Sequence, residues 1–341
     1  MTVKKAVIKG ISCQLASQKL TNEQLSQECQ DWSVEKIFDK TGISERYLAA
    51  PDECASDMGV AAAQKLFATG LCDPGEIDFL IFCNQTPDYF LPASACFIQD
   101  RLNLKNSCGA LDIGLGCSAF IYGLAVAKGL IETGMSENTL LITAETVSKF
   151  VNPRDRSMRT IVSDGASATL ISGSNGDKEA IGPFVLGTDG RGANMLIVPA
   201  GRFRVPLSPD TAMERDDGQG NFRSSQDFFM DGAEILNFAL TVIPKVVRQL
   251  LEKGKLNLED VDYFVFHQAN KFILEQLRKK MKIPEEKFCI NLERFGNTGS
   301  STIPMALEIA RLQNQIKKGA KVMLAAFGGG YSWAAAIVDF S

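Results

Sequence analysis

Histidine is almost absent from this chain, which has only one, His267, among its 341 residues. The nine cysteines are scattered along the sequence, and no two of them form a Cys-x-x-Cys pair. Zinc sites are built mostly from histidine and paired cysteine, so these absences argue against a metal centre. We therefore expect no metal and no permanently bound cofactor, and we interpret most of the cysteines as reduced, buried, small apolar side chains.

The chain also lacks an excess of positive charge and any long apolar run. Its formal net charge is −4 at pH 7 and its sequence pI is about 5.3. Proteins that bind nucleic acid or anionic membranes usually carry a basic field, so neither partner is expected. No run of about 18 apolar residues occurs, and no apolar signal segment follows the lysines near the N-terminus. These features predict a soluble, cytoplasmic protein.

What the chain does have is an alternation of short apolar strands with longer amphipathic helices, which is typical of α/β proteins. At this length, and with 45% hydrophobic residues, it can bury a large core. The predicted strands are 77–83, 109–113, 139–145, 166–172, 261–267, 321–327 and 333–339. The predicted helices are 56–69, 92–103, 118–134, 231–253, 270–282 and 302–317.

Two of the predicted strands match each other in residue type, position by position. They are Ile77-Asp-Phe-Leu-Ile-Phe-Cys83 and Val261-Asp-Tyr-Phe-Val-Phe-His267. The match predicts two related halves, 1–175 and 225–341, although chance similarity between two buried strands would give the same pattern. The segment between them, 176–224, is rich in Gly, Asp, Arg and Ser, and we expect it to lie over the outside or to cover a pocket.

Cys117 follows a predicted strand and two glycines, and it directly precedes a predicted helix. A thiol at a helix N-terminus faces unpaired N–H groups and the positive end of the helix dipole, which favour the thiolate. The same N–H groups can stabilise an oxyanion after the sulfur attacks a thioester. Cys117 is therefore a candidate nucleophile, and the alternative is an ordinary core cysteine.

His267 and Asn297 are the two groups that could assist such a nucleophile. His267 ends an apolar strand at the carboxyl edge, where sites in α/β proteins collect. Asn297 lies in the glycine-rich turn Gly296-Asn297-Thr-Gly299. The alternatives are a structural core histidine and an asparagine that merely tolerates left-handed turn geometry. Taken together with Cys117, the two residues predict a Cys/His/Asn site.

The motifs around these three residues resemble the β-ketoacyl-acyl-carrier-protein synthase III family of the thiolase superfamily. They are Gly-Leu-Gly-Cys117-Ser-Ala-Phe, His267-Gln-Ala-Asn270, Gly296-Asn297-Thr-Gly299 and Ala-Phe327-Gly-Gly-Gly330-Tyr-Ser-Trp333. The resemblance extends from Ala6 to the C-terminus. It implies a thiolase-like five-layered αβαβα fold built from two duplicated halves, and a homodimer.

The resemblance also implies a reaction. Cys117 would take an acyl group from a coenzyme A thioester, with the N–H groups of Cys117 and Gly329 as the oxyanion hole. His267 and Asn297 would then donate hydrogen bonds to the thioester oxygen of a malonyl group on acyl carrier protein while carbon dioxide leaves. The product would be a 3-oxoacyl-carrier protein, made in fatty acid initiation or a related pathway.

Further residues are assigned by the same resemblance. Arg156 and, more weakly, Lys36 would contact coenzyme A, although many relatives have a tryptophan at the position of Lys36. Leu91 and Phe327 would line the acyl pocket, and an aliphatic Leu91 suggests a starter larger than acetyl. The basic residues that would receive the carrier protein are Lys271, Arg278, Lys279 and Lys280, whose alternative role is an ordinary solvated helix face.

Two other functions fit the same sequence. One is an acyltransferase of specialised metabolism that uses a non-standard acceptor. The other is a catalytically silent dimeric paralogue, against which the retention of Cys117, His267 and Asn297 argues.

Overall fold

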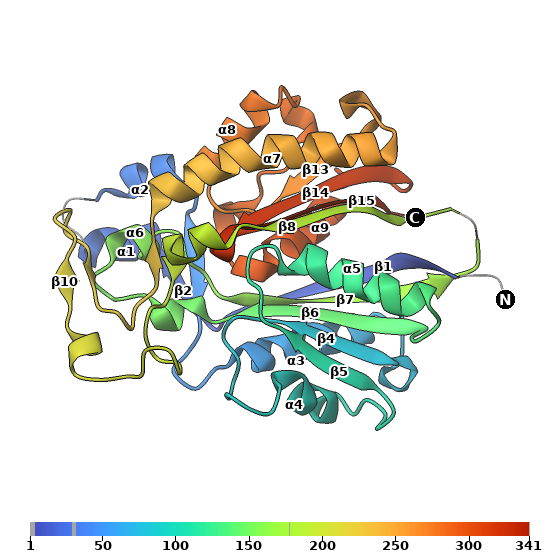
Figure 1. Ribbon diagram of the computed structural model, residues 1–341, viewed down its shortest axis with the longest axis horizontal. Helices are drawn as coiled ribbons and strands as arrows, with labels where there is room; N and C mark the ends of the chain where they lie inside the picture. The colour runs from blue at the N-terminus through green and yellow to red at the C-terminus, as the bar shows by residue number, and fades with distance from the viewer. Residues whose placement is uncertain (1–3, 29–31, 177, 341) are drawn as a thin grey trace.

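The computed structural model describes residues 4–28, 32–176 and 178–340, and it stacks two β-sheets with three layers of helices (Figure 1). Helices α3 (Ala55–Ala68) and α4 (Ser94–Arg101) cover the outer face of the first sheet. Between the two sheets lie α5 (Ala119–Glu132) and α9 (Thr302–Leu312). The outer face of the second sheet is covered by two more helices, α7 (Gly232–Gly254) and α8 (Lys271–Lys280). The five-layered αβαβα prediction is confirmed.

The first sheet has five strands in the order β1-β7-β6-β4-β5. Strand β4 pairs in parallel with β5 and β6, whereas β7 is antiparallel to both β6 and β1. The bounds of the strands are β1 Lys5–Leu15, β4 Phe79–Cys83, β5 Gly109–Ile113, β6 Asn138–Glu145 and β7 Gly165–Ser174.

The second sheet has four strands in the order β13-β14-β15-β8. Strand β13 is parallel to β14, and β15 is antiparallel to both β14 and β8. The bounds are β8 Ile181–Thr188, β13 Tyr263–Phe266, β14 Ala320–Gly328 and β15 Ser332–Phe340. Read from β8 to β13, this sheet repeats the order and directions of β1-β7-β6-β4 in the first sheet.

This repetition confirms the duplicated halves, but it moves the start of the second one. Strand β8 is the counterpart of β1 and lies within 176–224, so that segment is not wholly an insertion outside the sheets. The remainder of the segment contains short strands and turns. These are β9 (Leu196–Ile197), β10 (Arg215–Asp216) and β11 (Phe222–Arg223). The ranges 1–175 and 225–341 given for the two halves stay a prediction.

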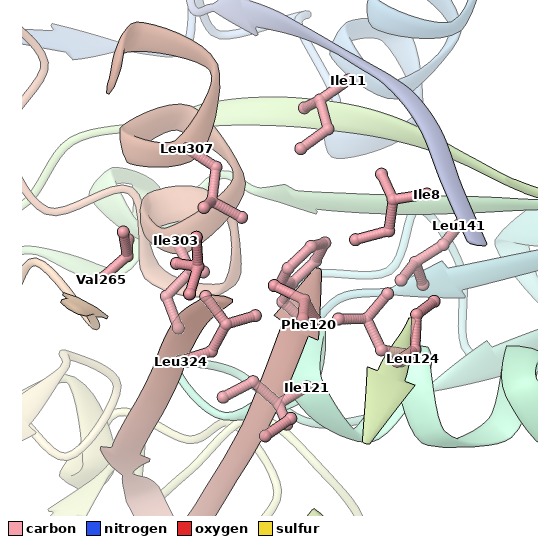
Figure 2. Close-up of a cluster of buried hydrophobic side chains, with 14 of the residues drawn as sticks. Ile8, Ile11, Phe120, Ile121, Leu124, Leu141, Val265, Ile303, Leu307 and Leu324 are labelled. Carbon is pink, nitrogen blue, oxygen red and sulfur yellow. The ribbon is translucent and has the colours of Figure 1, made fainter. Parts of the chain in front are cut away.

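Successive side chains of a strand point to opposite faces of its sheet, so each strand packs against the helix layers on both sides. In β4, Leu80 and Phe82 pack with α3 and α4, while Ile81 and Cys83 point into the central layer. Figure 2 shows this central cluster, in which Ile121 and Leu124 of α5 meet residues of α9 and both sheets. Because strands of both halves face α5 and α9, burial of apolar surface stabilises the two halves against each other.

The smaller elements gather at one end of the molecule (Figure 1). They include α1 (Asn22–Glu28), α2 (Val34–Thr41), α6 (Arg156–Arg159), β2 (Gln18–Thr21), β3 (Glu45–Leu48) and β12 (Phe229–Met230). Among the described residues, no helix has both the length and the apolar character needed to cross a membrane.

Candidate active site

Cys117, His267 and Asn297 line one cavity of about 70 Å³ between the two halves. The other polar side chains at its wall are Gln85 and Asn270. The remaining lining residues are apolar or glycine, and they include Val147, Met158, Leu196, Phe228, Ile235, Gly299, Phe327 and Gly328. The structure therefore brings together the three residues that the sequence selected, in a small and mostly apolar space.

Cys117 lies in the short turn between β5 and α5, and the end of β14 packs closely against it. A β-carbon placed on Gly328 would lie 2.7 Å from Cys117 Cβ and 3.0 Å from its sulfur, so only glycine leaves room for the thiol. Burial and, secondarily, the Glu145 carboxylate raise the pKa of the Cys117 thiol to about 12. The expectation of a depressed pKa at the helix start is therefore wrong: the resting thiol is protonated and needs a base.

His267 directly follows β13 and is held by contacts on several sides. Its backbone N–H donates to the Ala325 carbonyl at 2.8 Å, and its ring meets Phe327 edge-on with centroids 5.6 Å apart. Its Nδ1 lies 2.7 Å from Thr302 Oγ1. Burial lowers the pKa of His267 to about 3, so its imidazole is neutral at physiological pH.

Asn297 is oriented by the turn that contains it. The backbone N–H of Gly299 donates to Asn297 Oδ1 at 3.0 Å. Only the oxygen of the side-chain amide can accept this bond, so the Nδ2 group remains available to donate elsewhere. The Asn297 backbone N–H donates to the Ile161 carbonyl at 3.0 Å, which ties the turn to the other half of the chain.

Two buried residues beside the cavity were not selected from the sequence. Glu145, at the end of β6, accepts a hydrogen bond from the Gln85 N–H at 3.1 Å, while its other oxygen, Oε1, is buried without a partner. Burial is the main cause that raises the pKa of Glu145 to about 8. Thr302 is fully buried at the start of α9. Neither residue stands in a motif that a sequence reading would mark.

Comparison with known proteins identifies the family of the chain. Residues 111–190 match the family model for 3-oxoacyl-[acyl-carrier-protein (ACP)] synthase III, and residues 251–340 match the model for the C-terminal part of the same family. The beta-ketoacyl-[acyl-carrier-protein] synthase III of Caldanaerobacter subterraneus subsp. tengcongensis is 37% identical over 336 residues, which cover 98% of each protein. The chain belongs to this family. It is therefore related to condensing acyltransferases.

Two further synthase III proteins agree with this assignment. The one from Clostridioides difficile is 36% identical over 337 residues, which cover 99% of each protein. A crystal structure of a 3-oxoacyl-(acyl-carrier-protein) synthase III superimposes with a TM-score of 0.98 at 50% identity, covering 98% of this chain and all of that one. Both likenesses extend over nearly the whole length of the proteins compared.

Gly329, the predicted oxyanion-hole residue, directly follows Gly328, which lies against the candidate nucleophile Cys117. Gly328 ends β14 and contacts Cys117, and Gly329 begins the tight turn Gly329–Tyr331. Within this turn, Gly330 has φ 70°, a conformation that favours glycine. Gly328 is thus the residue of this segment that lies against Cys117, and the role of Gly329 in an oxyanion hole stays a prediction.

The two predicted acyl-pocket residues of the chain occupy different surroundings. Phe327 is buried and lines the cavity beside His267. Leu91 is 81% exposed and is not among the residues of the cavity wall. Its neighbours Tyr89 and Phe90 line a larger cleft of about 600 Å³, which shares Gln85, Val147, Leu196 and Phe228 with the smaller cavity. Within this chain alone, Leu91 does not bound the site.

The residues expected to meet coenzyme A lie near one another at the end formed by the small helices. Arg156 begins α6 and lines a small pocket together with Trp32. The Lys36 ammonium on α2 lies 5.6 Å from the centroid of the Trp32 ring. Sequence reasoning marked Lys36 but missed Trp32, although tryptophan occurs only twice in the chain. Trp32 lies just before Ser33, the residue that caps the N-terminus of α2.

The basic residues expected to receive the carrier all lie on α8, which begins beside the cavity at Asn270. Lys271, Lys279 and Lys280 are exposed. Arg278 differs, because its guanidinium donates to Glu275 at 2.8 Å and its side chain is only 15% exposed. An arginine paired within its own helix contributes little free positive charge, so the exposed basic face consists of the three lysines.

Proposed function

We propose that this chain catalyses the decarboxylating condensation of an acyl-coenzyme A starter with malonyl-acyl carrier protein, through an acyl-Cys117 intermediate. The observation that carries the proposal is the convergence of Cys117, His267 and Asn297 on one small apolar cavity. The products are a 3-oxoacyl-carrier protein, free coenzyme A and carbon dioxide. No permanently bound cofactor takes part in this scheme.

In the first half-reaction the Cys117 sulfur attacks the thioester carbonyl of the starter. The thiol proton passes to a base in the cavity and then to the departing coenzyme A sulfur, so acyl transfer is balanced. The N–H groups of Cys117 and Gly329 stabilise the oxyanion of the tetrahedral intermediate. One such donor is typically worth about 100- to 1000-fold in rate.

In the second half-reaction the malonyl carboxylate leaves as carbon dioxide, and negative charge builds on the thioester oxygen. Asn297 Nδ2 donates a hydrogen bond to this oxygen, as does His267 whenever its Nε2 carries a proton. The enolate carbon then attacks the acyl carbonyl on Cys117 and expels the sulfur. The mostly apolar wall of the cavity strengthens these hydrogen bonds, because water does not screen them.

Substrate binding is assigned to the surfaces around the cavity. Arg156, Lys36 and the Trp32 ring form a basic and aromatic end suited to a nucleotide. The carrier protein docks on the basic face of α8, formed by Lys271, Lys279 and Lys280. Leu91 serves the acyl pocket only if a second copy of the chain brings it to the cleft beside the cavity.

A homodimer supplies that second copy. Strand β5 is an edge strand of its sheet, and no strand among the described residues pairs with its free side. The segment beside the cleft exposes a cluster of apolar side chains, which are Tyr89, Phe90, Leu91 and Phe203. The rings of Phe90 and Phe203 lie 5.7 Å apart. A free strand edge next to exposed aromatic rings is typical of a subunit interface.

The test of the reaction is a two-stage intact-mass experiment with acyl-coenzyme A thioesters of increasing chain length. We expect a single acyl adduct on the wild-type protein and none on Cys117→Ala. Addition of malonyl-carrier protein then removes the adduct and yields a 3-oxo product. Asn297→Ala loads normally and does not condense. Loss of the adduct to another acceptor without carbon dioxide release would favour the specialised acyltransferase, and no adduct from any donor would favour the silent paralogue.

A further inference from the structure

A hydrogen bond between two buried serines joins the segment that carries Cys117 to the glycine-rich turn beside it. Ser118 directly follows Cys117, and Ser332 directly follows the turn Gly329–Tyr331. Their hydroxyl oxygens lie 2.8 Å apart, and the two residues are 0% and 4% exposed. Since they are 214 positions apart in the sequence, this bond connects the two halves of the molecule immediately next to Cys117.

Ser118 occupies the N-cap position of α5 but does not cap the helix. A serine at this position usually accepts a hydrogen bond from a backbone N–H of the first helical turn. In α5 the side chain makes no such bond, and the Ser118 hydroxyl meets Ser332 instead. Among the described residues, neither hydroxyl has a second partner. The hydroxyl of Ser118 therefore serves the contact between the halves rather than the helix.

Ser332 is also fixed relative to Gly328, the residue that lies against Cys117. The two are paired across β14 and β15, at the last position before the turn. Paired residues of antiparallel strands have α-carbons about 4.5–5.5 Å apart. A β-carbon on Gly328 would lie 2.7 Å from Cys117 Cβ, so this contact leaves little slack. The two serines, Gly328 and Cys117 therefore form a closed circuit, and the bond between the hydroxyls is the link that a substitution can remove.

The other supports of the turn lie on its far side. The Tyr331 ring stacks on Phe238 of α7 with centroids 4.1 Å apart. The Tyr331 carbonyl accepts from the Asp189 N–H, just beyond the end of β8, at 3.1 Å. Both contacts hold the turn within its own half of the chain. Of these three polar and aromatic contacts, only the bond to Ser118 reaches the segment that carries the nucleophile.

We infer that Ser118 and Ser332 are positioning residues, whose hydrogen bond sets the distance between the Cys117 segment and the glycine-rich turn for acyl transfer. The inference rests on the proposed acylation of Cys117, in which the two oxyanion donors are the N–H groups of Cys117 and Gly329. One donor belongs to each of the joined segments, so the bond controls their separation. Preorganised donors act only at the position that the oxyanion will occupy, and a misplacement of about 1 Å can cost about 100-fold in rate.

Single-turnover loading from acyl-coenzyme A, followed by intact mass, tests this inference. We expect Ser118→Ala and Ser332→Ala each to load about 10-fold more slowly at an unchanged half-saturating concentration, because the donors move and the binding surfaces do not. The double variant should be no slower than either single variant, since all three lack the same bond. Ser332→Thr keeps a hydroxyl and should restore the rate.

Alkylation of Cys117 by iodoacetamide separates positioning from general damage, because this displacement builds no oxyanion. Its rate, measured on the peptide that contains Cys117, should be the same in the wild type and in both alanine variants. The matched control is Ser136→Ala, which removes another buried hydroxyl bond, 3.0 Å long, to Thr139. That bond lies at the opposite end of β6 from Glu145, so the control should load at the wild-type rate.

Three results would overturn the inference while leaving acylation of Cys117 intact. They are unchanged loading in both alanine variants, an equal fall in loading and alkylation, and slowing in the double variant that is the product of the two single effects. Absence of an adduct on the wild-type protein would instead refute the proposed function.

Discussion

Replacement of Glu145 by glutamine should remove a large pH dependence from the stability of the protein. Glu145 is fully buried at the end of β6, and burial raises its pKa from 4.5 to about 8. Between these two values the folded protein keeps a proton that the unfolded chain has lost. The free energy of unfolding therefore falls as pH rises through this window, and it is unaffected by Glu145 below pH 4.5.

The size of the effect follows from the distance between the two pKa values. At about 1.36 kcal/mol per pH unit, the shift corresponds to a loss of up to roughly 5 kcal/mol on going from acid to pH 8. Glutamine keeps the bond from the Gln85 N–H but leaves a buried amide nitrogen where Oε1 has no partner. That cost, about 1–3 kcal/mol, is independent of pH. The two proteins should therefore differ in slope rather than in a constant offset.

The assay is urea unfolding of the wild type and Glu145→Gln, monitored by circular dichroism at several pH values between about 5 and 8. Protomer concentration is held constant, because association also contributes to apparent stability. We expect the wild type to lose several kcal/mol over this range relative to the variant. Parallel curves for the two proteins would mean that Glu145 titrates normally, and the conclusion that burial raises its pKa would be wrong.

Three other substitutions test separate parts of the structure. Gly328→Ala places a β-carbon 2.7 Å from Cys117 Cβ and should slow loading about 100-fold, as followed by intact mass. The same clash should also lower the temperature of thermal unfolding. Arg46→Met removes a fully buried guanidinium that donates to Asn22 Oδ1 at 2.8 Å and to the Thr160 carbonyl at 3.1 Å. We expect the free energy of unfolding in urea to fall by about 2–4 kcal/mol, and an unchanged value would contradict the structural role of Arg46. Lys279→Glu/Lys280→Glu should raise the KM for malonyl-carrier protein about 10-fold without changing loading from acyl-coenzyme A, whereas Lys317→Glu/Lys318→Glu, on another surface, should leave both unchanged.

The strongly patterned parts of the fold could be predicted from the sequence. The matching strands at 77–83 and 261–267 became β4 and β13, because a buried parallel strand needs an unbroken apolar run. The helix predicted over 302–317 is shorter in the structure, where α9 ends at Leu312. Element types were thus more predictable than element ends, which depend on local capping and packing.

Two edge strands were missed for a physical reason. Strand β1 carries Lys9 and Gly10, and β8 carries Gly182-Pro183, which reads as a chain breaker. An edge strand tolerates such residues because one side of its backbone has no partner. The register of the β8–β15 pair shifts between Ala336 and Val338 of β15. Gly182-Pro183 of β8 lies opposite this point.

In the site, the sequence predicts which residues are involved but not the environment that the fold gives them. Cys117, His267 and Asn297 stand in distinctive motifs and could be found. The raised pKa of the Cys117 thiol could not, because it depends on burial and on Glu145, a residue from a different strand. Thr302 is likewise unremarkable in sequence and acquires its importance only by facing Nδ1 of His267. The pairing of Arg278 with Glu275 is the exception, since residues three apart on a helix are neighbours.

The position of β8 decides where the chain could be divided for fragment complementation. Strand β7 ends at Ser174 and β8 begins at Ile181, so the natural junction between the halves is the short link that joins them. A C-terminal fragment starting at residue 225 would lack the strand that covers β15, and it would expose that backbone edge to aggregation. A cut in the link would leave both sheets complete, and the two fragments could then reassociate through the apolar layer formed by α5 and α9.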